Sequence, residues 1–206
     1  AAITEAKEGA TVTLLKNVTE DVTIPANTTV TLDLNGKTLT NESSHTITNH
    51  GTLTIKDSVG GGTVDNVTHA KGALVNYGNA ILESGTLTRS KEAGSSPSTS
   101  GGNSWYVVDN NKGTMTVKGG NIVSTGKFSS LIRNIGDSTT KAQLTIESGK
   151  LSNGFIAVKN DDNGDLKISG GEITSDDQAV QNWSQAEISG GTMNGAVYTW
   201  AADNSA

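Results

Sequence analysis

The sequence predicts an all-β protein built as a parallel β-solenoid, and three observations support this fold class. The 206 residues include 25 Gly, 28 Thr and 19 Asn, which are residue types that disfavour helix interiors. A short apolar phrase recurs along the chain, and a column of Asn residues recurs with it. Only 33% of the residues are hydrophobic, which is enough when each coil buries one narrow apolar row.

The recurring phrase consists of an apolar residue, any residue, a second apolar residue, one or two polar residues and then usually Gly. Apolar residues two apart point to the same side of a strand, so we expect pairs such as Leu53 with Ile55, and Leu166 with Ile168, to fill the core. Successive copies are 20 to 35 residues apart, because extra residues can leave at a corner without disturbing the stacked strands. The copies begin at Leu32, Leu53, Ala80, Met115, Leu144, Leu166 and Ala186.

A second element follows most copies of the phrase, namely a pair of small apolar residues with an Asn just beyond it. Leu131-Ile132 precedes Asn134 in this way, and Ala179-Val180 precedes Asn182. We expect the Asn side chains to point inward, stack along one corner and satisfy neighbouring backbone groups. The predicted column contains Asn49, Asn76, Asn110, Asn134, Asn160 and Asn182.

The N-terminal part begins the array with a strand-like segment at residues 11–19, a turn at Pro25-Ala26-Asn27 and a second segment at residues 29–39. These residues, and the Leu32–Gly36 phrase above all, resemble the right-handed parallel β-helix repeats of large cell-surface and secreted proteins from Gram-positive, often gut-dwelling, bacteria. The resemblance implies a right-handed, pectate-lyase-like β-helix, and the repeat spacing predicts about eight to nine coils of roughly 20–22 residues. It also implies an extracellular location on a bacterial surface, with this chain as an excised module or mature fragment.

We expect residues 1–206 to form a single domain. The largest insertion, at about residues 89–104, is rich in Gly and Ser and is predicted to be an external loop. The repeat resumes in phase beyond it at Val107-Val108, which favours one continuous array over two linked domains.

Composition narrows the classes of function. The net charge of −6 and the lack of a basic stripe disfavour nucleic-acid binding, and no apolar stretch is long enough to enter a membrane. His45, His50 and His69 show no ligand spacing, so we expect no metal site and no cofactor.

Exposed aromatic residues are the main functional signal. Trp183 follows Asn182, and Trp200 stands at a similar place one coil later with Tyr198 beside it, so the two tryptophans are predicted to stack. Aromatic rings suit both sugars and protein hot spots. Trp105 and Tyr106, beside the long insertion, form a second candidate contact. The alternative is that Trp183 and Trp200 only cover the C-terminal end of the core.

We therefore expect a noncatalytic adhesion or ligand-binding module whose partner is a host glycan or a host surface or secreted protein. One alternative is a carbohydrate-active enzyme such as a glycoside hydrolase, which needs paired acids in a groove. The pairs Asp161-Asp162 and Asp176-Asp177 are expected on different corners, which disfavours that activity. A mechanical stalk is the third hypothesis. Ice binding through outward threonine rows is a further one, although the rows are interrupted.

Overall fold

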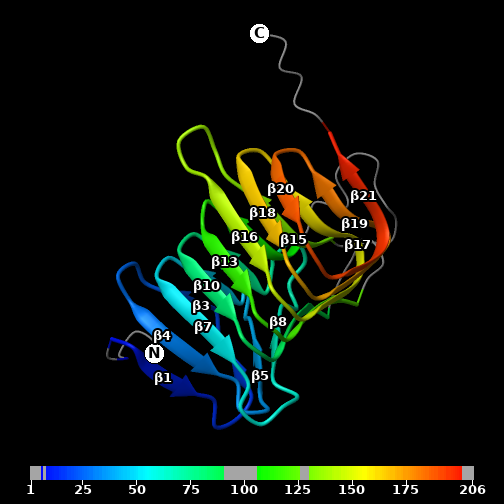
Figure 1. The fold of residues 1–206 in the computed structure, drawn as a ribbon. Helices are drawn as coiled ribbons and strands as arrows, with labels where there is room; N and C mark the ends of the chain where they lie inside the picture. The colour runs from blue at the N-terminus through cyan, green and yellow to red at the C-terminus, as the bar shows by residue number, and fades with distance from the viewer. Residues whose placement is uncertain (1–5, 7, 91–105, 126–129, 201–206) are drawn as a thin grey trace.

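The computed structural model describes residue 6 and residues 8–90, 106–125 and 130–200. Within these residues the chain forms 21 β-strands and no helix, so no helix is available to cross a membrane. All strand pairs are parallel, and the chain winds through about seven right-handed turns (Figure 1). The predicted fold class is confirmed. The turns are slightly fewer than the eight to nine expected, because insertions at the corners lengthen several of them.

The first face of the solenoid is an eight-stranded parallel sheet. Its register aligns the second apolar residue of successive repeat phrases, as in the pairs Ile55 with Leu82 and Val117 with Ile146. The first copy differs from the prediction by two residues, because Val30 and Leu32, and not Leu32 and Leu34, pair with Leu53 and Ile55. Its strands, in spatial order, are β1 (Ala10–Thr13), β4 (Thr29–Asp33), β7 (Thr52–Lys56), β10 (Asn79–Leu82), β13 (Thr114–Val117), β16 (Ala142–Ile146), β18 (Gly164–Ile168) and β20 (Gln185–Ile188).

The second and third faces begin as separate stacks of short strands. The second face contains β2 (Val18–Thr19), β5 (Thr38–Thr40), β8 (Thr63–Asp65), β11 (Thr86–Arg89) and β14 (Asn121–Ser124). The third face contains β3 (Val22–Ile24), β6 (Ile47–Asn49), β9 (Leu74–Asn76), β12 (Tyr106–Asn111) and β15 (Ser130–Ile135).

The two stacks merge in the last turns because the corner between them becomes tight. There β17 (Lys150–Asn160), β19 (Glu172–Asn182) and β21 (Thr192–Thr199) each run through both faces. Register irregularities within β17 and β19 mark the place where each long strand bends. Of the predicted insertion, Arg89 is buried and ends β11, whereas residues 91–104 lie outside the described part of the chain.

The interior is filled by the apolar rows that the repeat phrase predicts. Leu53, Ile55, Leu166 and Ile168 are each at most 1% exposed. The Asn column lies at the corner where the third face ends and is also buried. Each Asn donates its Nδ2–H to the Oδ1 of the Asn in the next turn, at 2.6–2.8 Å, from Asn49 through to Asn182. The predicted amide ladder is confirmed.

Candidate functional site

Three of the five aromatic residues singled out in the sequence, Trp183, Tyr198 and Trp200, meet at the end of the last two turns. Trp183 follows β19 and Trp200 follows β21, and their backbone N–H groups donate to Asn160 O and Asn182 O in the preceding turns. The two indole rings stack with centroids 4.3 Å apart and planes 4° from parallel. Tyr198 completes the group, with its ring 5.6 Å from that of Trp200 and tilted by 36°. We call Trp183, Tyr198 and Trp200 the aromatic corner.

The aromatic corner is open to solvent. Trp183 is 42% exposed, Trp200 38% and Tyr198 48%. Because the tryptophans lie face to face, each ring has one face covered by the other, and a ligand can reach only the ring edges and the outer faces of the stack. Gln181 accepts a hydrogen bond from Trp183 Nε1 at 3.3 Å, which helps to fix the orientation of the ring.

The tryptophans do not close the end of the core. In the last turn, Ile188 is 42% exposed and Val197 is 49% exposed, although both continue rows that are buried in earlier turns. The rings therefore lie at the outer corner, next to Asn182, and leave these apolar side chains in contact with solvent. This placement favours a surface role for the rings over a capping role.

A second stacked pair lies at the same corner several turns earlier. His50 follows Asn49 and Tyr77 follows Asn76, and their rings are 5.0 Å apart with an angle of 7° between the planes. Tyr77 is 44% exposed. Strands β12, β15 and β17 separate this pair from the aromatic corner, so the structure does not bring the two together.

The second candidate contact, Trp105 and Tyr106, is only partly described. Trp105 lies outside the described residues. Tyr106 is the first residue of β12 and is only 9% exposed, so the prediction of an exposed ring was wrong. Arg133 covers the ring, with its guanidinium carbon 5.1 Å from the ring centroid, and burial raises the pKa of Tyr106.

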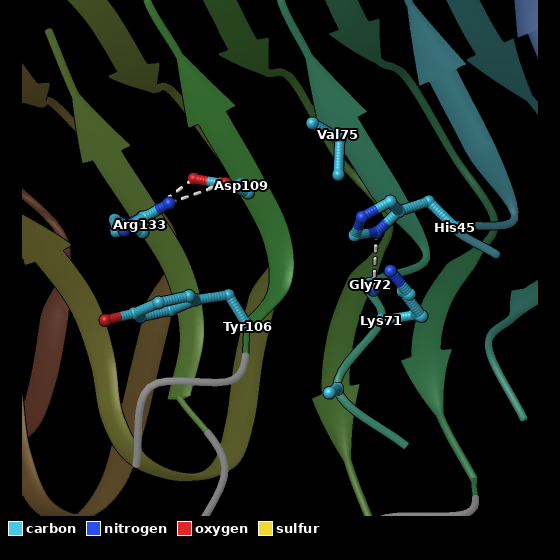
Figure 2. Close-up of a pocket in the computed structure, with 8 residues that line it drawn as sticks. His45, Lys71, Gly72, Val75, Tyr106, Asp109 and Arg133 are labelled. Atoms are coloured by element: carbon cyan, nitrogen blue, oxygen red, sulfur yellow. Dashed lines mark hydrogen bonds and ion pairs between the residues drawn. The ribbon is translucent and has the colours of Figure 1, made fainter. Parts of the chain in front are cut away.

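Tyr106 forms part of a pocket on the third face that sequence reasoning did not find. The pocket has a volume of about 190 Å³. Figure 2 shows His45 and Lys71 on one side of it and Tyr106, Asp109 and Arg133 on the other. Arg133 donates to Asp109 through Nε at 2.8 Å and through Nη2 at 2.7 Å. This bidentate pair raises the pKa of Arg133 and fixes the plane of its guanidinium group.

On the opposite side of the pocket, His45 Nδ1 accepts a hydrogen bond from the Gly72 backbone N–H at 2.9 Å. Burial of the imidazole, and then the positive charge of Lys71, hold the pKa of His45 below its ordinary value of 6.5. The neutral ring therefore carries its proton on Nε2, which is the nitrogen that does not face Gly72.

The acidic residues near this face are engaged with cations. Asp109 pairs with Arg133, and Asp161 pairs with Lys159 at 2.9 Å. Asp161 follows β17, whereas Asp176 and Asp177 lie inside β19 at the tight corner between the second and third faces, as the sequence predicts. Among the described residues, no group of three or more His, Asp or Glu side chains is arranged to hold a metal ion.

The outward threonine row of the first face is interrupted in the register of the sheet. Ile81 stands between Thr54 and Thr116, and Lys167 and Glu187 end the row. A flat threonine array is therefore limited to a few turns.

Comparison of the chain with protein-family models, with curated proteins and with solved structures finds no match. The aromatic corner and the pocket are therefore the features from which a function can be inferred.

Proposed function

We propose that this chain is a noncatalytic ligand-binding module of a bacterial surface protein, of the pectate-lyase-like, Gram-positive and gut-associated kind that its repeats resemble. Its partner is a host glycan or a host protein, and its location is extracellular. The observation that carries the proposal is the stacked, exposed pair of Trp183 and Trp200 with Tyr198 beside it.

Exposing these rings to water is unfavourable unless a partner covers them. Each tryptophan places a large apolar surface in water at the outer corner, while Ile188 and Val197 at the end of the core also stay exposed. Large exposed apolar clusters mark interaction sites, and Trp and Tyr are the residues most enriched in binding hot spots. Truncating one such ring typically costs about 2 kcal/mol or more of binding free energy, which is roughly thirtyfold in affinity.

The proposal is tested by screening the purified chain on a glycan array and on a panel of mucosal host proteins. The variant Trp183→Ala/Trp200→Ala should keep the β-sheet circular dichroism spectrum and lose the binding. The matched control, His50→Ala/Tyr77→Ala, removes another exposed stacked pair from the same corner and should keep it. If the tryptophan variant unfolds, the rings have a structural role and the proposal fails.

A mechanical stalk is the second candidate, and the continuous amide ladder favours it. Five consecutive side-chain hydrogen bonds join six turns along the solenoid axis and add to the backbone ladder of each face. Such an array gives a stiff rod that needs no ligand. Absence of saturable binding in both screens would support the stalk and contradict the binding module.

A further inference from the structure

We propose that the pocket between His45, Lys71 and Arg133 binds one carboxylate-bearing sugar residue, such as a hexuronate. This site differs from the aromatic corner. Arg133 and Tyr198 belong to the same outward row of the third face but are three strands apart, which is about 14 Å at the usual strand spacing. The inference does not depend on whether the tryptophans bind anything.

The charge of the pocket wall favours an anionic ligand. The positive charge of Arg133 is matched by Asp109, and His45 is held neutral. Lys71 forms no ion pair with another residue in the described part of the chain. The wall therefore carries one uncompensated positive charge next to a cavity, which favours a singly charged anion.

The hydrogen-bond donors of the pocket are already oriented. Because His45 Nδ1 accepts a hydrogen bond from the Gly72 N–H, the proton of the neutral ring is on Nε2, and this N–H can donate to a ligand. The two hydrogen bonds to Asp109, together with the ring of Tyr106, hold the guanidinium of Arg133 in one plane, which leaves its Nη1 available. Groups that are fixed before binding lose little conformational entropy when a ligand arrives.

The backbone is strained at the rim of the pocket. Ala70 lines the pocket with φ of 66°, a left-handed conformation that is unfavourable for an L-residue with a Cβ. The turn is closed by a hydrogen bond from Lys71 N to Thr68 O at 3.3 Å, and it places Lys71 beside His45. Strain of this kind at a cavity is typical of a ligand site.

Size and polarity identify the class of ligand. Val75 and Ala70 give the cavity an apolar part, and a volume of about 190 Å³ suits one sugar ring better than a bare ion. Each oxygen of Asp109 accepts one hydrogen bond from Arg133 and keeps a lone pair for a hydroxyl group. The same carboxylate repels a dianion such as phosphate. A ligand with one carboxylate and several hydroxyl groups satisfies both sides of the pocket.

The test is a titration of the isotopically labelled full chain with glucuronate, followed by the NMR signals of the Gly72 amide and the Arg133 Nε–H. We expect saturable shifts with glucuronate. Glucose should bind at least about tenfold more weakly, because it lacks the carboxylate and loses a charge-assisted hydrogen bond. Inorganic phosphate should also bind at least about tenfold more weakly, because Asp109 repels its second negative charge. Equal binding of glucose, or of phosphate, would overturn the proposal.

Two lysine variants show whether the pocket is responsible. Lys71→Met keeps the length of the side chain and removes its charge, and it should weaken glucuronate binding about tenfold. Lys118→Met removes an exposed charge beyond β13 on another face and should change the affinity less than about twofold. Equal effects of the two variants would overturn the proposal. Retained glucuronate binding in Trp183→Ala/Trp200→Ala would show that the pocket acts independently of the aromatic corner.

Discussion

Removing one central member of the amide ladder should strongly destabilise the solenoid. Asn134 is fully buried and accepts a hydrogen bond from Asn110 Nδ2 at 2.7 Å. Its own Nδ2 donates to Asn160 Oδ1 at 2.8 Å and, more weakly, to the carbonyl oxygens of Asp165 and Ala142. Asn134→Ala removes all four contacts and leaves a small cavity in the corner.

The loss in the free energy of unfolding can be estimated from the polar groups that remain after Asn134→Ala. Asn110 Nδ2 keeps two backbone carbonyl partners, Gly113 O at 3.0 Å and Gln143 O at 2.9 Å. Asn160 Oδ1 loses the side-chain donor that the ladder provides, and a buried polar atom without a partner costs about 1–3 kcal/mol. With the lost hydrogen bonds and the cavity, we expect the free energy of unfolding to fall by about 3–4 kcal/mol, a large part of the usual 5–15 kcal/mol.

The assay is urea denaturation followed by circular dichroism, with Asn121→Ala as the control. Asn121 is an exposed residue of β14, and its side chain makes a single long contact of 3.4 Å with Thr86 Oγ1. The control should shift the free energy of unfolding by less than about 0.5 kcal/mol. Similar losses for Asn134→Ala and Asn121→Ala would refute the argument that the ladder stabilises the fold.

Two further predictions concern close approach and pH. Gly78→Ala should lower the free energy of unfolding by about 1–3 kcal/mol, because the added Cβ would overlap Gly51 O and the His50 backbone of the preceding turn. The measurement is the midpoint of urea denaturation, with the exposed neighbour Asn79→Ala as the control. Equal midpoints for the two variants would contradict the prediction. Stability should also fall as the pH drops below 6.5, since the pKa of His45 is lowered in the folded state and the unfolded chain takes up the proton first. Protonation converts His45 Nδ1 into a donor that faces the Gly72 N–H. The variant His45→Asn keeps an acceptor, so its free energy of unfolding should decline less between pH 7 and 5. Identical declines in both proteins would show that another group is responsible.

The repeat phrase and the Asn column predict the architecture because they report the two things that a solenoid must satisfy in every turn. Apolar residues two apart, such as Leu53 and Ile55, reveal which side of a strand is buried. An inward Asn at a fixed corner reveals the register, because its amide donates to the amide oxygen of the Asn in the adjacent turn. Both signals are local in sequence, so the variable insertions do not obscure them.

The stack of Trp183 on Trp200 could be predicted from the same register, since each ring follows the end of the third-face strand in its turn. The burial of Tyr106 could not. Its ring is covered by Arg133, which lies 27 residues later in the chain, and nothing near Tyr106 in the sequence indicates that a cation will cover it.

One wall of the pocket could be predicted from the sequence, and the other could not. The residue before each Asn of the column faces outward, so Asp109 and Arg133, which precede Asn110 and Asn134, must be neighbours in adjacent strands. For Asp109 and Arg133, this rule places opposite charges side by side and predicts their ion pair. His45 and Lys71 follow no such rule, because they lie in the irregular corner between the second and third faces, where turns differ in length. The regular strands thus fix one wall of the pocket, and the variable corner supplies the other wall with the neutral imidazole and the uncompensated ammonium group. In a solenoid of this kind, the corners that break the repeat are therefore the places where a binding site for a particular ligand can arise without disturbing the core.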